Sequence, residues 1–191
     1  LAGTLDMSGR NETINGLTGA GNVINGGTLT VGADDSNATF AGRIRNATAL
    51  IKTGAGVQTL TNDNDYSGAT TVDGGTLLIL DGKLSGAGAV TVNNGATLGG
   101  SGTIGGSASI AGTLTPGNSP GTITFSQNLT LLGTSSTLME LASDTSYDQI
   151  VVGGQFTPGG TLTLSLVGGY SPQPYQVFHL FDWASLGSGS F

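Results

Sequence analysis

Residues 50–79 read LIKTGAGVQTLTNDNDYSGATTVDGGTLLI, and this stretch decides the fold. Short runs in which polar and apolar residues alternate are separated by corners rich in glycine, asparagine or aspartate. Alternation with a period of two is typical of β-strands, and glycine and asparagine favour tight turns. The same pattern returns in weaker form along much of the chain. A repeat of this size cannot bury its apolar side alone, so we expect copies to stack on one another.

A Gly-Thr-Leu/Ile triplet marks the expected start of strands throughout the chain. It occurs at residues 3–5, 27–29, 75–77, 102–104, 112–114, 121–123 and 160–162, with Ala-Thr-Leu at 96–98 as a near copy. We expect the glycine to take a corner with positive φ, the threonine to face outward and the aliphatic residue to face inward. The uneven spacing of the triplets suits a coil with more than one strand in each turn.

The sequence predicts short strands and no helix, because apolar residues never recur at helical spacing without an intervening glycine. The predicted strands include 28–31, 57–60, 70–72, 76–80, 89–92, 123–125, 129–132, 137–141, 149–152, 161–167 and 175–181.

Two all-β architectures fit this pattern, an antiparallel sandwich and a parallel solenoid. Asn-Gly pairs at 15–16 and 94–95 suit the hairpins of a sandwich. However, aromatic residues make up only 6% of the chain, and residues 1–120 contain only Phe40 and Tyr66. Small aliphatic side chains suit stacked turns, so we predict a right-handed, single-stranded parallel β-helix (β-solenoid) with roughly eight to ten rungs. We divide it into regular coils at 1–140 and C-terminal coils with an aromatic end segment at 141–191.

Composition excludes several classes of protein. Five basic residues and a net charge of −7 cannot neutralise a phosphate backbone, so nucleic-acid binding is excluded. No apolar run approaches the roughly 18 residues of a membrane span. The chain has no cysteine, which excludes disulfides and cysteine-based metal or redox sites. We expect no cofactor.

The motif at 50–79 resembles the autotransporter-associated β-strand repeat, also called the passenger-associated transport repeat. Residues 19–21 and 39–42 are similar to the half-repeat that precedes it in that family, and 95–123, with TPGNSPG at 115–121, to the segment that follows. Residues 136–164 and 178–183 resemble later family segments. The chain departs from the pattern at 43–47, where a glycine corner is expected. The resemblance implies a parallel β-helix in a protein exported to the surface or exterior of a Gram-negative-type bacterium.

The acidic corners are the first candidates for chemistry. Asp63, Asp65 and Asp73, with Tyr66, offer carboxylates for a calcium or catalytic site, and Lys52 is the basic residue expected near Asp63 and Asp65. Asparagine and aspartate are also favoured turn residues, and we interpret these positions as structural corners. Further acidic residues are interpreted as isolated, solvated corners: Asp34, Asp35, Asp144 and Asp148.

Repeated threonines form a second candidate surface. Thr-x-Thr occurs at 28–30, 113–115, 122–124 and 161–163. Outward hydroxyls on regular strands can order water or bind glycans, but an ice-binding surface needs the motif on every rung. Threonine is also a good strand former, and we favour that structural interpretation.

The aromatic tail is the third candidate. Alternation places Tyr175, Val177, His179, Phe181 and Trp183 on one face of the expected strand, with Phe178 and Leu180 on the other. A run that is apolar on both faces indicates a covered strand or an interface. His179 is then a packed or edge residue rather than a base. The candidate interface comprises Tyr175, Val177, Phe178, His179, Phe181 and Trp183.

The sequence thus predicts a structural extracellular scaffold, a passenger or stalk that mediates adhesion and associates with itself end to end or laterally, including into fibres. No catalytic or metal-binding residue is assigned, and the chain is not expected to be an enzyme. Two alternatives stay open: an adhesin that binds surface glycans, and a carbohydrate-active β-helix enzyme with Asp63 and Asp65 near Lys52.

Overall fold

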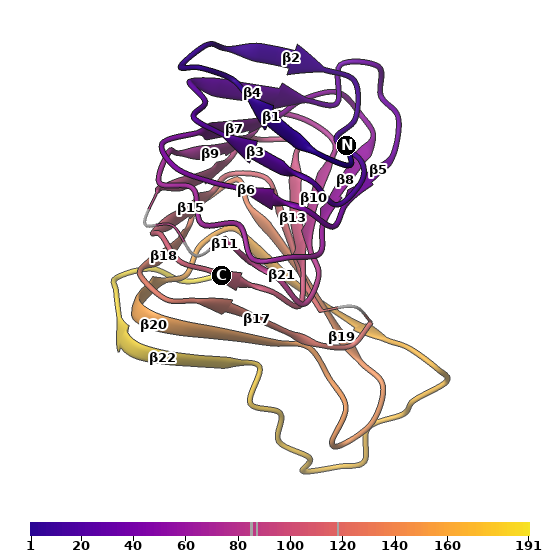
Figure 1. Ribbon diagram of the computed structural model, residues 1–191. Coiled ribbons are helices and arrows are strands. Elements are labelled where there is room, and N and C mark those ends of the chain that lie inside the picture. Colours follow the sequence, from indigo (N-terminus) through magenta and orange to yellow (C-terminus); the bar gives the residue numbers. More distant parts are fainter. Residues whose placement is uncertain (85, 87, 118) are drawn as a thin grey trace.

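The computed structural model describes residues 1–84, 86, 88–117 and 119–191, and these residues form strands and turns. This part of the chain contains no helix, and therefore none that is long and apolar enough to cross a membrane. The named strands pair in parallel, and successive turns stack from the N-terminal to the C-terminal end of the molecule (Figure 1).

The strands lie on three faces of the stack, and the chain visits the faces in the same order in every turn. The first face contains β1 (Thr4–Asp6), β3 (Asn22–Ile24), β6 (Arg43–Ile44), β11 (Lys83–Leu84), β14 (Thr103–Ile104), β17 (Thr122–Phe125) and the starts of β20 (Gln149–Thr157) and β22 (Phe181–Leu186). The second contains β2 (Glu12–Ile14), β4 (Thr28–Val31), β7 (Ala49–Lys52), β9 (Thr70–Val72), β12 (Val90–Val92), β15 (Ala108–Ile110), β18 (Leu129–Leu131) and the end of β20. The third contains β5 (Ala38–Phe40), β8 (Val57–Leu60), β10 (Thr76–Ile79), β13 (Thr97–Gly100), β16 (Thr113–Pro116), β19 (Ser136–Leu141) and β21 (Thr161–Leu166).

The register of the ladders gives the length of a turn. Leu50 pairs with Thr70, and Thr70 pairs with Val90, so a central turn takes about 20 residues. Strand β20 passes round a corner, since its first residues pair with β17 and its last with β18. The chain completes about eight such turns. The prediction of an all-β parallel β-solenoid with eight to ten rungs is confirmed.

Inward side chains form columns that run along the stack. On the second face one column passes through Leu29, Leu50, Thr70, Val90, Ala108, Leu129 and Phe156. These side chains are all buried. Burying a large aliphatic side chain stabilises the fold by about 1.5–3 kcal/mol, so the columns supply most of the favourable free energy.

The Gly-Thr-Leu/Ile triplets behave largely as expected. Their threonine is the first residue of β1, β4, β10, β14, β16, β17 and β21, and Thr97 opens β13 in the same way. The role expected for the glycine is correct only in part. Gly75 and Gly160 have positive φ, but Gly112 does not. A Cβ atom on Gly112 would collide with the carbonyl oxygen of Ala96 in the preceding turn, so close stacking requires glycine there.

At 43–47, where the family pattern has a glycine corner, the chain turns at an asparagine. Asn46 adopts a φ of 64°, so asparagine makes the left-handed corner in place of glycine. The neighbouring Arg45 lies 3.3 Å from the carboxylate of Asp65 in the next turn. The chain therefore turns at this point without a glycine.

Lys52 interrupts the core with a charge. Its side chain is fully buried, in the column between Val31 and Val72. The Nζ atom donates hydrogen bonds to the carbonyl oxygens of Thr53 at 2.6 Å, Gly54 at 3.0 Å and Gly74 at 3.1 Å. Burial lowers the pKa of Lys52 below its ordinary value, and the nearby Asp35 carboxylate opposes that change.

Gln58 and Asn64 are also buried within 50–79. The Gln58 amide donates to the Leu17 carbonyl oxygen at 2.9 Å and accepts from the Leu17 N–H at 3.0 Å, across a sequence separation of 41 residues. The Asn64 Oδ1 atom accepts the Ile44 N–H at 2.9 Å. Both side chains thus bind the main chain of other turns.

Candidate functional site: the C-terminal aromatic surface

The strand predicted at 175–181 is wrong. Strand β22 begins only at Phe181, and residues 167–180 form a long corner insertion between β21 and β22. The backbone turns at Tyr175, whose φ of 70° does not occur in a β-strand, directly after Pro172 and Pro174. Figure 1 shows this insertion extending beyond the stacked strands at the C-terminal end of the molecule.

The expected alternation is retained in the insertion but fails at its end. Tyr175 is fully exposed, Val177 is 73% exposed and His179 is exposed, while Phe178 and Leu180 lie half-buried. Phe181 also points inward, next to Leu180, because the chain enters β22 at this residue. The predicted interface therefore separates into an outward set and an inward set, and its role as an interface stays a prediction.

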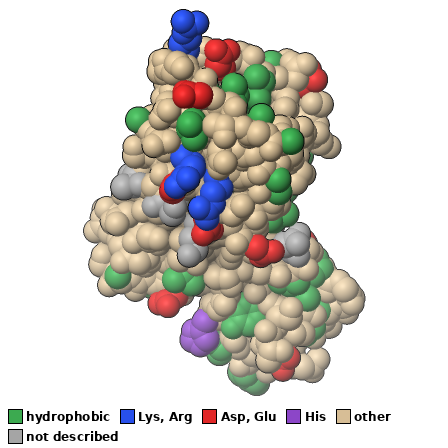
Figure 2. All heavy atoms as spheres, viewed as in Figure 1, with side chains coloured by type: hydrophobic (Ala, Val, Ile, Leu, Met, Phe, Trp, Pro, Cys, Tyr) green, Lys and Arg blue, Asp and Glu red, His purple; other side chains and the backbone are tan. Residues whose placement is uncertain are grey.

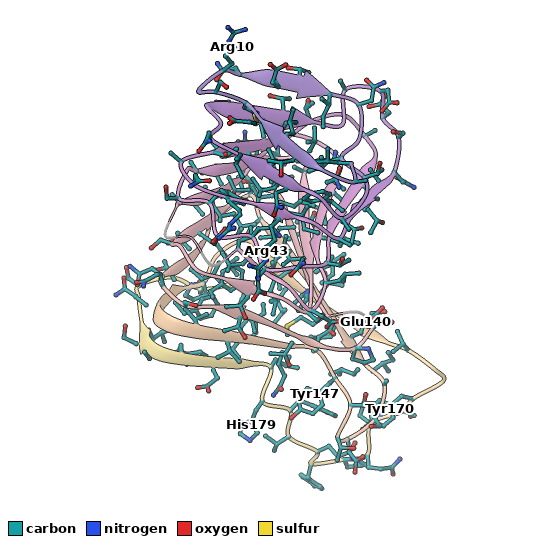
Figure 3. All side chains as sticks on the ribbon, in the orientation of Figure 1. Arg10, Arg43, Glu140, Tyr147, Tyr170 and His179 are labelled. Atoms are coloured by element: carbon teal, nitrogen blue, oxygen red, sulfur yellow. The ribbon has the colours of Figure 1, made fainter. Side chains whose placement is uncertain are left out.

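Aromatic rings hold the insertion against the body of the solenoid. Phe178 makes edge contacts with Tyr147, at a centroid distance of 5.3 Å, and with Tyr170, at 6.4 Å. Tyr147 lies in the corner between β19 and β20, one turn earlier. Phe181 stacks on the buried Phe156 at 5.2 Å. Figure 3 shows Tyr147 and Tyr170 together at this end, far from Arg10.

A concavity with a volume of about 410 Å³ lies beside these rings. It is lined by side chains from β21, from β22, from the corner insertion and from the residues after β22: Leu162, Phe178, His179, Leu180, Phe181, Trp183 and Phe191. Trp183 is 41% exposed and Phe191 44%. Figure 2 shows His179 at the surface with hydrophobic side chains beside it, while the visible Lys and Arg side chains lie in the other half of the molecule.

His179 is exposed at the edge of the concavity. Its main-chain carbonyl oxygen accepts a hydrogen bond from the Gln149 side chain at 3.0 Å, and its ring lines the concavity. Among the described residues, no group of three or more histidine, aspartate or glutamate side chains lies close enough to hold a metal ion.

Asp63 and Asp65 lie in the corner after β8, whereas Lys52 ends β7 at a different corner. Asp65 pairs with Arg45, while Asp73 accepts a hydrogen bond from the Asn93 amide at 2.6 Å. The Lys52 ammonium is enclosed by carbonyl oxygens, one of them from Gly74, at the corner that also contains Asp73, whose N–H donates to the Lys52 carbonyl oxygen at 2.8 Å. The tyrosine of this group, Tyr66, is buried and bonded to Thr70 at 2.6 Å. Lys52, Asp65, Asp73 and Tyr66 therefore have partners within the fold, while Asp63 is half-buried and its N–H donates to the Asn62 side chain at 2.8 Å.

The remaining acidic corners differ from one another. The Asp34 carboxylate is exposed, and hydrogen bonds from Ser36 lower its pKa. Asp35 accepts the Ala55 N–H at 2.6 Å, and Asp144 is exposed. The expectation of a solvated corner is wrong for Asp148, which is 1% exposed.

Asp148 braces a corner that sequence reasoning missed. Its two carboxylate oxygens accept the N–H groups of Gly121 and Glu140, each at 2.8 Å, and burial raises its pKa. Ser119 donates to the Glu140 carboxylate at 2.7 Å. No sequence signal links these residues, because they come from three successive segments. Asn118, in the same TPGNSPG corner, lies outside the described residues.

Outward hydroxyls form one column on the second face and a shorter one on the third face (Thr76, Thr97, Thr113, Ser136 and Thr161), rather than a regular double array on one face. The column contains Thr13, Thr30, Thr71, Thr91, Ser109, Thr130 and Thr157, and Ile51 interrupts it. On the third face, Thr115 is aligned with Gly99, so Thr-x-Thr does not continue from rung to rung. The arrangement does not meet the condition for an ice-binding surface.

Comparison with known proteins identifies the central repeat. Residues 50–79 match the family Passenger-associated-transport-repeat. The chain is also 33% identical, over 170 residues, to the protein named Adhesin BmaC autotransporter from Brucella suis biovar 1 (strain 1330). This match covers 87% of the chain and 5% of that relative, so the chain spans about a twentieth of its length. The chain therefore carries a passenger-associated-transport repeat at residues 50–79, and over most of its length it is similar to a part of an autotransporter adhesin.

Proposed function

We propose that this chain is a structural segment of an extracellular passenger scaffold that takes part in adhesion at the bacterial surface. The observation that carries the proposal is the position of the repeat. Residues 50–79 lie within a parallel ladder whose columns continue on both sides, and so the repeat works as one layer of a continuous scaffold.

The comparisons support an extracellular, non-enzymatic role. The matched family is a repeat of transported passengers, and the relative is named an adhesin and an autotransporter. The contacts that Lys52, Asp65 and Asp148 make within the fold agree with a scaffold. The same comparisons support export from a Gram-negative-type bacterium.

Adhesion is tested with beads coated with the 191-residue chain. We expect saturable binding of the beads to host cells or to extracellular-matrix proteins. The control is Leu77→Asp, which places a charge in a fully buried column and unfolds the layer. Equal binding by both coatings, or no binding by either, would contradict the adhesive role.

A neutral glycan is a second candidate ligand, favoured by the hydroxyl column of the second face. Neighbouring strands lie about 4.8 Å apart, so the column offers a hydroxyl at nearly every such step along the stack. Saturable binding on a glycan array without turnover is expected, and it should weaken in the double variant Thr91→Val and Ser109→Ala. Thr145→Val, exposed in a corner, is the matched control.

A further inference from the structure

Three Asn-Gly pairs occur in the chain, at residues 15–16, 25–26 and 94–95. Glycine has no Cβ atom, so its backbone nitrogen can reach the side-chain carbonyl carbon of the asparagine before it. Attack by this nitrogen is the first step of asparagine deamidation. The attack requires a glycine N–H that makes no hydrogen bond and an asparagine side chain that can turn. The fold therefore decides which of the three pairs can react.

The pair at 94–95 lies at the tip of the corner between β12 and β13. The Ala96 N–H donates to the Asn93 carbonyl oxygen at 3.0 Å, and Gly95 has a φ of 85°, so residues 93–96 form a type II turn. Asn94 and Gly95 are both exposed. Within the described part of the chain, no group bonds to the Asn94 side chain or to the Gly95 N–H. The amide and the nitrogen that attacks it are thus both free.

The pair at 25–26 is held by the turns on both sides of it. The Gly26 N–H donates to the Oγ1 atom of the buried Thr48 at 3.1 Å, and Gly26 itself is buried. The Asn25 amide donates to the Asp6 carboxylate at 3.3 Å, while the Asn25 carbonyl oxygen accepts the Gly9 N–H at 2.6 Å. A reaction at Asn25 therefore requires a local opening of the stack.

The pair at 15–16 is an intermediate case. Gly16 is half-buried, and a Cβ atom on it would lie 2.7 Å from the Cβ atom of Ala38. The next residue, Leu17, donates its N–H to the Gln58 side chain at 3.0 Å. These contacts restrain the backbone on which the attack depends, so the pair should react more slowly than the one at 94–95.

We propose that Asn94 is a site of spontaneous modification, at which the folded chain converts asparagine to a mixture of isoaspartate and aspartate. The Gly95 nitrogen forms a bond with the Cγ atom of Asn94, and the Cγ–Nδ2 bond breaks. Ammonia leaves with the proton of the attacking N–H, and water then opens the five-membered succinimide at either carbonyl group. The net charge of the chain changes from −7 to −8, because a neutral amide becomes one carboxylate. The inference does not depend on adhesion.

The stack limits the structural effect of this modification to the tip of the corner. Isoaspartate adds one methylene group to the main chain between residues 94 and 95. Apart from its chain neighbours, no atom lies within 4 Å of the place that a Cβ atom on Gly95 would take. The base of the corner is fixed, because the carbonyl oxygens of Asn93 and Ala96 pack against Gly112 of the next turn. We therefore expect the tip to take up the extra length while β12 and β13 keep their partners.

Peptide mapping by mass spectrometry measures the three sites during incubation of the folded 191-residue chain at mildly alkaline pH. We expect conversion at Asn94 to be at least roughly tenfold faster than at Asn25, because Asn25 reacts only after a buried hydrogen bond opens. In urea the three sites should react at similar rates, since unfolding frees every glycine N–H. Asn94→Gln should remove the main acidic species seen by ion exchange, because glutamine forms the larger ring far more slowly. It should leave the far-UV circular dichroism unchanged.

Thr48→Val is the matched test of protection at the second pair. Valine keeps the shape of threonine but lacks the Oγ1 atom that accepts the Gly26 N–H, so conversion at Asn25 should rise several-fold while conversion at Asn94 stays the same. The comparison of folded and urea-unfolded wild type decides the proposal even where this variant folds poorly. Equal rates at Asn94 and Asn25 in the folded chain would overturn it, as would an Asn94 that reacts only in urea.

Discussion

Three long polar side chains are buried in the core of the central repeat. Lys52, Gln58 and Asn64 occupy inward positions where neighbouring turns place aliphatic residues, and each binds main-chain groups. A buried polar group is tolerated when its hydrogen bonds are complete, and removing it leaves its partners unsatisfied.

Lys52→Met tests the contribution of the buried ammonium. Methionine retains most of the aliphatic stem but leaves three carbonyl oxygens without this donor, so we expect the free energy of unfolding to fall by about 3 kcal/mol. Ile51→Val, at the adjacent outward position, should change it by about 0.5 kcal/mol. Urea unfolding followed by circular dichroism measures both. Equal stability of the methionine variant and wild type would show that the carbonyl groups do not need the charge.

Tyr66 gives the fold a dependence on alkaline pH. Burial raises its pKa well above the ordinary value of about 10, so the folded state keeps the phenol proton that the unfolded chain loses. Stability is therefore fully present below pH 10 and falls above it, by up to about 1.4 kcal/mol per pH unit. Thermal unfolding between pH 8 and 12 should show a smaller decline in Tyr66→Phe. The exposed-site control, Tyr175→Phe, should keep the wild-type decline.

At the scale of elements, one aromatic ring anchors the corner insertion, residues 167–180, against the solenoid. Phe178 lies between Tyr147 and Tyr170, which come from different corners. Phe178→Ala should release residues 167–180, and limited proteolysis at Tyr170 or Tyr175 should become at least several-fold faster while the core stays folded. Val177→Ala, at the exposed neighbouring position, is the control. The Gln176 Oε1 atom also accepts hydrogen bonds from the Tyr170 hydroxyl and the Gln173 N–H. Unchanged cleavage in Phe178→Ala would show that these hydrogen bonds alone order residues 167–180.

The elements also show where sequence reasoning succeeds and fails. Each Gly-Thr-Leu/Ile triplet opens a strand, because a turn residue followed by alternation is local information. The segment 175–181 alternates just as well, yet prolines in its approach and aromatic contacts with another turn keep it out of the ladder. The sequence also does not predict that Lys52 is buried, because the carbonyl groups that accept its hydrogen bonds come together only when the turns stack.

At the scale of the whole molecule, each turn contacts mainly the turns before and after it. The stability of such a stack is the sum of turns and of the contacts between neighbours. A loss of packing in a central turn therefore uncouples the two halves of the stack. A loss of packing in β21 affects one contact, the one with β19.

Leu98→Ala and Leu164→Ala measure this difference. Leu98 is fully buried in a central turn, and we expect its truncation to cost about 2–5 kcal/mol and to broaden the unfolding transition. Leu164, in β21, is 49% exposed, so its truncation should cost about 0.5 kcal/mol. Hydrogen exchange should locate the extra opening around β13. Equal effects of the two substitutions would contradict a nearest-neighbour stack.

The polar side chains inside residues 50–79 have a consequence for the way the chain winds. Leucine, isoleucine and valine pack alike, so an aliphatic column gives little resistance when one turn winds out of phase with the next. Lys52, Gln58 and Asn64 meet their main-chain partners in a single alignment. A mis-wound coil would enclose an ammonium and two amides without those partners, at a cost of several kcal/mol. We therefore expect the repeat to set the phase of winding for the turns on either side of it.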